Sequence, residues 1–193
     1  MADDVPEVLT ALASAFAGLG ARWYVFGAQA VIAVGVPRLT ADIDVTVEEP
    51  TQGTHALVDA LASQGLRLRD VGDPATFIAQ TRVIPVEHVE SGLPVDVVLA
   101  GPGLEEEMLS RTRMRRVGAS QIPFIDTADL LALKILAGRD KDLEDVRAVV
   151  RAAPPDLVLS VARQRIATLG AVLDDSTLVA TFDRLVDTPG KRR

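Results

Sequence analysis

Two aspartates one residue apart, Asp42 and Asp44, are the side chains of this 193-residue chain whose spacing points most directly to chemistry. They lie in Asp42–Val47, where polar residues alternate with apolar ones, a pattern that predicts a strand. Because successive side chains of a strand point to opposite faces, both carboxylates share one face. Two neighbouring carboxylates repel each other, and Mg²⁺ or Mn²⁺, which prefer hard oxygen ligands, relieve that repulsion. The pair therefore predicts a divalent-metal site, and the alternative is a solvated Asp-x-Asp at a strand edge.

A tight turn precedes this strand. The run Trp23–Phe26 is aromatic and β-branched, which predicts a strand, and Gly27 allows the backbone to turn sharply after it. Ala28–Val34 is small and apolar, which predicts a short buried helix that Gly35 ends. Backbone N–H groups at the start of a helix bind phosphate oxygens. The turn therefore predicts a phosphate-binding backbone ahead of the acidic pair.

This order of Gly turn, short helix, Arg-x-Thr segment and Asp-x-Asp strand resembles the DNA polymerase β-type nucleotidyltransferase superfamily. The segment Arg38–Asp44 is most similar to its minimal bacterial members, which include the toxins of abortive-infection and toxin–antitoxin systems and the antibiotic nucleotidyltransferases. The resemblance implies that residues of this part of the chain contact the nucleotide, namely Gly27, Ala28, Arg38 and Thr40. Ala28 stands where the family usually has Ser or Gly, and it offers no hydroxyl to a phosphate oxygen.

A third acid, Asp96, lies within the apolar run Leu93–Leu99, which predicts another strand. A charged group inside such a strand needs a partner or a metal ion. In the resembled family a third carboxylate on a neighbouring strand completes the metal site, which implies that Asp96 joins Asp42 and Asp44. The alternative is an edge-strand Asp that faces water.

The C-terminal part adds one lysine and two acids. The pattern predicts a helix over Ala128–Ala137, with Lys134 on or beside its apolar face, and a second helix after Gly138. The acids Asp142 and Asp145 share a face of that second helix. In the resembled toxin-like enzymes a helical Lys and a downstream Asp are needed for activity. This implies a catalytic role for Lys134, which would neutralise phosphate charge, and a substrate- or nucleotide-binding role for Asp142 or Asp145. We expect Lys134 to point into a solvated cleft, and the alternative is an ion pair between the two helices.

Two further strands carry informative residues. Pro85 predicts that the strand Arg82–Val89 lies at the edge of its sheet, because proline cannot donate a ladder hydrogen bond. Three arginines would share a face if their segment is a strand: Arg111, Arg113 and Arg115. They predict either a solvated edge strand or a contact surface for a triphosphate or an RNA backbone.

Together these elements predict an α/β (α+β) protein with the nucleotidyltransferase fold, in which helices flank a mixed sheet. We expect a catalytic core at 1–125, a helical region packed on it at 126–187, and a flexible tail at 188–193.

The composition and charge of the chain exclude several kinds of site and partner. The chain has no Cys, which excludes disulfides and thiolate metal sites. His55 and His88 are far apart and form no metal-ligand spacing in the sequence. The net charge of −7 argues against a broad nucleic-acid-binding surface. We expect a cytoplasmic protein with no membrane partner, because no signal-peptide pattern and no membrane-length apolar run occurs.

The predicted function is metal-dependent transfer of a nucleoside monophosphate from a nucleoside triphosphate to a hydroxyl. The acceptor is an RNA, a protein or a small molecule such as an antibiotic, and a toxin-like enzyme would also have an antitoxin partner. The alternative is a module with the same fold that binds a nucleotide or a partner protein with little turnover.

Overall fold

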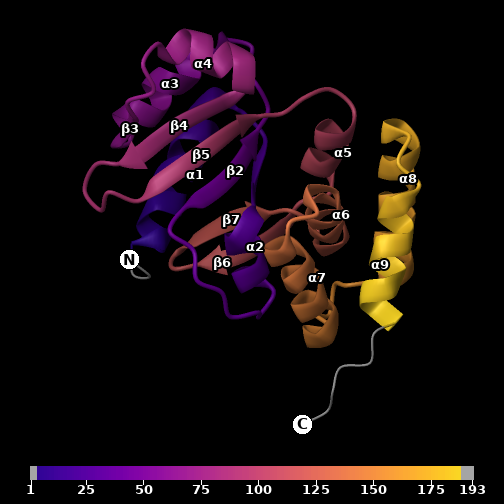
Figure 1. The fold of residues 1–193 in the computed structure, drawn as a ribbon. Helices are drawn as coiled ribbons and strands as arrows, with labels where there is room; N and C mark the ends of the chain where they lie inside the picture. The colour runs from indigo at the N-terminus through magenta and orange to yellow at the C-terminus, as the bar shows by residue number, and fades with distance from the viewer. Residues whose placement is uncertain (1–3, 188–193) are drawn as a thin grey trace. The chain divides into compact units, whose positions relative to one another are not determined.

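Seven strands form one mixed sheet in residues 4–187, the part of the chain that this computed structural model describes (Figure 1). The strands are β1 Trp23–Phe26, β2 Ile43–Val47, β3 Leu66–Leu68, β4 Val83–His88, β5 Pro94–Leu99, β6 Arg113–Val117 and β7 Ser120–Phe124. The helices are α1 Val5–Leu19, α2 Gly27–Ala33, α3 Gly53–Ser63, α4 Pro74–Thr81, α5 Leu104–Ser110, α6 Thr127–Ala137, α7 Asp140–Ala152, α8 Leu159–Leu173 and α9 Thr177–Asp187.

These elements form two compact units. The first comprises residues 4–29 and 39–125 and contains the whole sheet, and the second comprises residues 30–38 and 126–187 and contains α6 to α9. The division into a core at 1–125 and a helical region packed on it stays a prediction. The segment 30–38 was expected in the core but groups with the C-terminal helices. The expected tail at 188–193 lies outside the described residues.

The sheet has the strand order β3-β4-β5-β2-β1-β7-β6. Strands β2 and β5 are parallel, as are β1 and β7, and the other neighbours are antiparallel. The mixed sheet that the sequence predicts is therefore confirmed.

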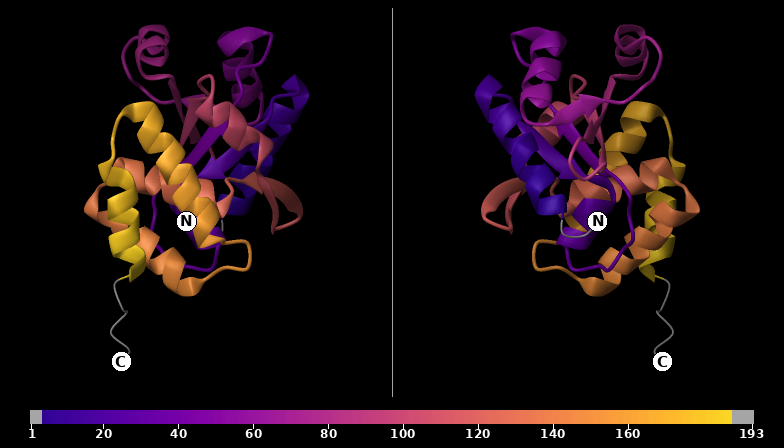
Figure 2. Two further views of the ribbon diagram at one scale, coloured as in Figure 1. Left: turned by 90° about the vertical axis from the view of Figure 1, so that its right-hand side faces the viewer. Right: turned by 90° about the vertical axis from the view of Figure 1, so that its left-hand side faces the viewer.

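One face of the sheet is apolar and carries α1 and α3. Its buried side chains from the central strands are Val25, Ile43, Val45, Val47, Ile84, Val86, Val95 and Val97. The helices α1 and α3 contact each other, and the side-on views show them along the same side of the sheet (Figure 2). The ring of Phe16 in α1 meets that of Trp23 at 5.0 Å between centroids, which places α1 on this face. Burying each such aliphatic side chain contributes roughly 1.5–3 kcal/mol, so this layer is a main source of stability.

The other face of the same strands carries Asp44, Thr46 and Asp96, because side chains alternate along β2 and β5. Thr46 is buried there, and the hydroxyl of Tyr24 donates a hydrogen bond to the sulfur of Met108 in α5 (3.7 Å). The acidic residues therefore lie on the face opposite to α1 and α3.

The expectation that Arg82–Val89 is an edge strand is wrong, because β4 lies between β3 and β5. The carbonyl of Pro85 accepts a hydrogen bond from the N–H of Arg69 (2.9 Å), so the ring nitrogen of Pro85 faces the same neighbour. Strand β3 ends at Leu68, before that level. Proline is tolerated inside the sheet because it faces the chain beyond the end of a short strand, where no ladder donor is required.

The second unit is a helical layer in which α6 contacts α7, α8 and α9. The carboxylate of Asp126 caps α6 by accepting from the N–H of Ala128 (3.0 Å), and Gly138, with φ 63°, ends that helix. The helix ends that the sequence predicts are therefore closely reproduced.

Candidate functional site

The turn at Gly27 and the carboxylate of Asp44 lie against each other. Gly27 has φ +64°, a left-handed conformation that side chains with a Cβ rarely adopt. A Cβ at this position would fall 2.9 Å from Cγ of Asp44 and closer still to its Oδ2. Register explains the proximity, since Phe26, the last residue of β1, pairs with Asp44 in β2. The turn therefore leaves room for the carboxylate only because residue 27 has no side chain.

Asp44 and Asp96 lie side by side on neighbouring strands. They are register partners across the parallel pair β2 and β5, so their side chains project from the same face. Both side chains are partly exposed, and that of Asp96 is 40% accessible. The alternative of an edge-strand Asp96 does not hold, because β5 lies inside the sheet.

Asp42 lies outside the strand in which the sequence places it. Strand β2 begins at Ile43, and Asp42 is exposed in the preceding loop. Its Oδ1 accepts a hydrogen bond from the hydroxyl of Thr40 (2.5 Å). This bond holds the carboxylate in the loop, where the strict alternation of a strand no longer fixes its direction.

The metal-ligand roles of Asp42, Asp44 and Asp96 stay predictions. Among the described residues, Asp42, Asp44 and Asp96 do not form a group of three ligand atoms within 4.8 Å of one another. The guanidinium of Arg69, just after β3, instead donates a hydrogen bond to Oδ1 of Asp96. Arg69 is a residue that sequence reasoning missed, and no local pattern marks it, because the contact spans 27 positions.

The chemistry of these donors nevertheless fits a hard divalent cation. Asp44 and Asp96 present carboxylate oxygens on one sheet face, and Gly27 keeps that space open. Ala28 follows in the first turn of α2 and is partly exposed. The nucleotide-binding roles of Gly27, Ala28 and Thr40 stay predictions.

Lys134 does not point into a solvated cleft. Its side chain is 7% accessible, and Nζ lies 3.1 Å from Oδ1 of Asp142 and 2.6 Å from Oδ2 of Asp145. The interhelix ion pair, which the sequence left as the alternative, is therefore what the structure contains. The reason is that α6 and α7 pack against each other, so the two acids of α7 meet the lysine of α6.

Two arginines extend this cluster. Arg38 donates from Nη1 to Oδ1 of Asp145 (2.7 Å), and Arg139 donates from Nε to Oδ2 of Asp142 (2.5 Å). Burial alone raises the pKa of the Asp142 carboxyl, but the hydrogen bonds from Arg139 and Lys134 outweigh it and hold that pKa below its ordinary value. The buried Nε of Arg38 has no hydrogen-bond partner among the described residues. These five charged residues all belong to the second unit, whereas the three aspartates belong to the first.

The arginine-rich segment forms part of an edge strand. Arg113 and Arg115 lie in β6, which ends the strand order, whereas Arg111 precedes that strand and donates to Glu107 in α5 (3.0 Å). The expected common face therefore holds for Arg113 and Arg115 and not for Arg111. A contact surface for RNA or triphosphate stays a prediction.

A second group of side chains was not anticipated. Among the described residues, Glu7, His88 and Glu90 place one ligand atom each within 4.8 Å of the others. No pattern in the sequence marks this group, because Glu7 is far from His88 and Glu90 along the chain.

None of the helices within residues 4–187 combines the length and the apolar character that a membrane span requires.

Comparison with known proteins shows the fold. No family model matches the sequence, and no curated protein is significantly similar to it in sequence. The solution structure of the antibiotic-resistance factor ANT(2'')-Ia is similar with a TM-score of 0.63 at 13% identity, covering 90% of this chain and 95% of that one. An antigenic nucleotidyltransferase-like protein from Paracoccidioides brasiliensis is similar with a TM-score of 0.58 at 16% identity, covering 93% of each chain. The predicted nucleotidyltransferase-like fold is therefore confirmed, and the toxin-like subtype stays a prediction.

Proposed function

We propose that the protein is a nucleotidyltransferase that moves a nucleoside monophosphate from a nucleoside triphosphate to a hydroxyl group. The observation that carries this proposal is the arrangement at Gly27, where the carboxylate of Asp44 lies against a turn without a side chain and beside Asp96. The shared fold with nucleotidyltransferase-like proteins supports it.

In this proposal Asp42 and Asp44 hold Mg²⁺ or Mn²⁺ on the triphosphate, and Asp96 completes the metal site. The ion supplies charge stabilisation for the entering and leaving oxygens when it is bound. The acceptor oxygen forms a bond to the α-phosphorus, the bond from that phosphorus to the bridging oxygen breaks, and pyrophosphate leaves. Asp96 accepts the hydroxyl proton, which requires the Arg69 guanidinium to move from the oxygen that it now contacts.

The charged cluster of the second unit has a separate proposed role. Arg38 neutralises phosphate charge, and Asp145 orients its guanidinium through the bond to Nη1. The side chain of Arg38 is 21% accessible, which leaves part of its guanidinium free to meet a ligand and supports this role. Lys134 then acts through Asp142 and Asp145 as a positioning residue.

The more specific part of the proposal concerns the acceptor, which is the molecule whose hydroxyl group receives the nucleoside monophosphate. A small molecule such as an antibiotic is the first class to test, because the fold is similar to that of an antibiotic-resistance factor. RNA or protein as acceptor, with an antitoxin as partner and a cytoplasmic location, is the toxin-like alternative. A small reading frame next to the gene would favour that alternative.

The decisive experiment measures pyrophosphate release and label transfer from α-labelled nucleoside triphosphates with Mg²⁺ and each acceptor class. We expect Asp44→Asn to abolish transfer while Asp59→Asn, which changes an exposed acid of α3, leaves it unchanged. Mg²⁺ or Mn²⁺ should also raise the melting temperature of the parent and not of Asp42→Asn/Asp44→Asn, because binding to the folded state alone adds stability. An equal gain in both proteins would exclude the metal site.

A second candidate function has one observation in its favour. The bond from Arg69 to Asp96 holds the proposed base, which suits a module that binds a nucleotide or a partner protein without turnover. Triphosphate binding without pyrophosphate release, in the parent and in Arg69→Gln alike, would favour this candidate.

A further inference from the structure

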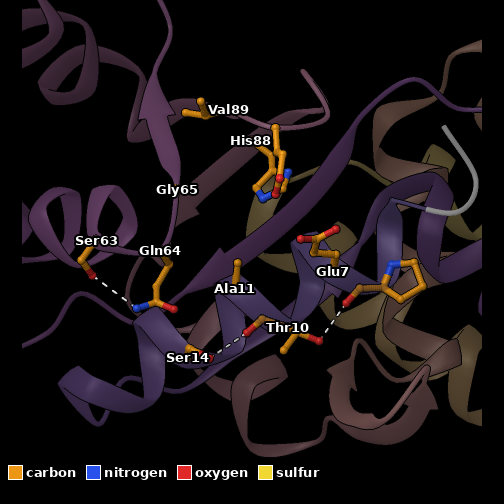
Figure 3. A pocket seen from close by; sticks show the side chains of 11 residues that line it. Glu7, Thr10, Ala11, Ser14, Ser63, Gln64, Gly65, His88 and Val89 are labelled. Carbon is orange, nitrogen blue, oxygen red and sulfur yellow. Dashed lines mark hydrogen bonds between the residues drawn. The ribbon is translucent and has the colours of Figure 1, made fainter.

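A pocket on the α1 and α3 side of the sheet lies away from the three aspartates. It has a volume of about 870 Å³ and is lined by residues of α1, of the end of α3 and of the end of β4 (Figure 3). Pro85 is the register partner of Asp96, so the alternation of β4 places His88 on the opposite face of the sheet. This pocket and the carboxylate pair of Asp44 and Asp96 are therefore separate sites within the first unit.

Three side chains with metal-ligating atoms meet at this pocket. Glu7 comes from α1, His88 is the last residue of β4, and Glu90 lies in the following turn. One nitrogen or oxygen of each lies within 4.8 Å of the other two. The ring of His88 and the carboxylate of Glu7 point toward each other across the pocket (Figure 3).

The histidine is both buried and held in place. Its side chain belongs to a residue that is 6% exposed, and Nδ1 lies 3.0 Å from the hydroxyl oxygen of Ser91. No described residue forms a hydrogen bond with Nε2. When Nδ1–H donates to Ser91, Nε2 carries the free lone pair, and this orientation by a hydrogen bond is typical of histidines that bind a metal. Nε2 is not one of the buried polar atoms that lack a partner among the described residues, so it stays accessible to a ligand from the pocket.

We propose that Glu7, His88 and Glu90 form a binding site for a transition-metal dication, with Zn²⁺ as the fitting ion. One imidazole nitrogen and two carboxylate oxygens are a donor set that Zn²⁺ accepts, and it leaves the fourth position of a tetrahedral ion open to the pocket. The carboxylates of Glu7 and Glu90 are exposed and can close on the ion, whereas His88 is fixed by the strand.

The ion would join two parts of the first unit that are distant in sequence. Glu7 lies in the first turns of α1, and the other two ligands lie at the hairpin between β4 and β5. This hairpin is closed by backbone bonds between His88 and Leu93 (2.9 Å) and between Gly92 and His88 (2.7 Å). Metal binding would therefore fasten the beginning of α1 to a rigid turn. This proposal does not depend on nucleotidyl transfer, since none of its ligands belongs to the proposed catalytic residues.

The test is calorimetric titration of the Asp42→Asn/Asp44→Asn protein with ZnCl₂, so that the carboxylates of the other site contribute no binding. We expect one equivalent of Zn²⁺ to bind, and Glu7→Gln or Glu90→Gln to weaken it at least about tenfold. Both changes fall on exposed side chains, so these variants should fold as the parent does. His88→Gln should abolish binding, whereas His55→Gln, which removes a histidine that is 93% exposed, should not change it.

A spectroscopic measurement completes the test. Co²⁺ bound in place of Zn²⁺ should give a visible absorption spectrum that disappears in Glu90→Gln and persists in His55→Gln. Absence of Zn²⁺ binding in the titrated protein, or equal binding in the parent background and in the Glu7→Gln and Glu90→Gln variants, would overturn the proposal.

Discussion

Gly27 has two separate reasons to be glycine, a backbone with φ +64° and the carboxylate of Asp44 where a Cβ would lie. Gly20 has the same backbone conformation, φ +65°, but no other atom comes within 4 Å of the place that its Cβ would take. Comparing Gly20 with Gly27 separates the backbone strain from the overlap with Asp44. Both glycines have the same backbone conformation, and only Gly27 lies against Asp44.

Gly27→Ala and Gly20→Ala should therefore differ in a measurable way. Each should lose about 1–2 kcal/mol of stability from the left-handed backbone. Gly27→Ala should lose more, because the new methyl group displaces Asp44, and its affinity for Mg²⁺-triphosphate should fall. Urea unfolding and calorimetry measure the two effects, and equal stability losses with unchanged triphosphate affinity would contradict the proposed role of the turn.

Replacing Lys134 shows how much its buried ion pairs contribute to stability. Lys134→Met leaves Asp142 and Asp145 without their shared ammonium and should cost on the order of 3–5 kcal/mol, as for other broken buried pairs. Lys141→Met, on the exposed side of α7, should change stability by less than about 0.5 kcal/mol. Urea unfolding of both variants measures this.

The same variant bears on the proposed positioning role of Lys134. If folded Lys134→Met protein transfers nucleotide as fast as the parent, the cluster serves the architecture alone. If it unfolds at the parent's urea concentration, the ion pairs contribute no stability.

At the scale of elements, α8 holds α6 through one partly buried arginine. Arg165 in α8 lies 2.5 Å from Oδ1 of Asp126, the residue that caps α6, and 2.9 Å from Oδ2 of Asp129 in its first turn. Two positions earlier in the same helix, Arg163 pairs with Asp183 of α9 on the surface. The two arginines differ mainly in the burial of the acids that they meet.

Arg165→Met should thus destabilise the protein far more than Arg163→Met. Loss of Arg165, the partner of the buried Asp126 and Asp129, should cost roughly 3 kcal/mol or more. The exposed pair of Arg163 contributes at most about 1 kcal/mol, because water screens it. Thermal and urea unfolding of the two variants gives the comparison, and a larger effect at Arg163 would show that the packing of α6 on α8 does not depend on this ion pair.

At the scale of the whole molecule, the protonation of Asp142 makes the free energy of unfolding depend on pH. Asp142 is a buried acid whose folded-state pKa lies below its ordinary value of about 3.9. A lowered pKa stabilises the folded protein above the unfolded-state pKa, and this contribution disappears as the pH falls through the folded-state pKa. The contribution is therefore complete above about pH 4 and is lost below it.

The free energy of unfolding, measured from pH 6 to pH 3 for the parent and Asp142→Asn, checks this. The difference between the two proteins should be constant above about pH 4 and should shrink as the pH falls further, because the carboxylate of the parent then takes up a proton. A difference that stays constant down to pH 3 would mean that Asp142 is not the titrating group.

The sequence by itself determined the features that depend on neighbours along the chain. The turn at Gly27 follows from the requirement of a left-handed backbone for glycine, and the common face of Asp44 and Thr46 follows from the alternation of a strand. The start of α6 at Asp126 and its end at Gly138 follow from capping chemistry within a few residues. These are local properties of the backbone, so a single segment contains the information for each.

Only the tertiary structure decided which distant residues meet. It placed the guanidinium of Arg69 on Asp96, buried Lys134 between two acids, and brought Glu7 to His88. It also placed β4 inside the sheet, although the strand contains a proline. Each outcome depends on the register of paired strands and on the packing of one helix on another, and the balance of desolvation and ion pairing at such contacts is set by residues that no local pattern connects.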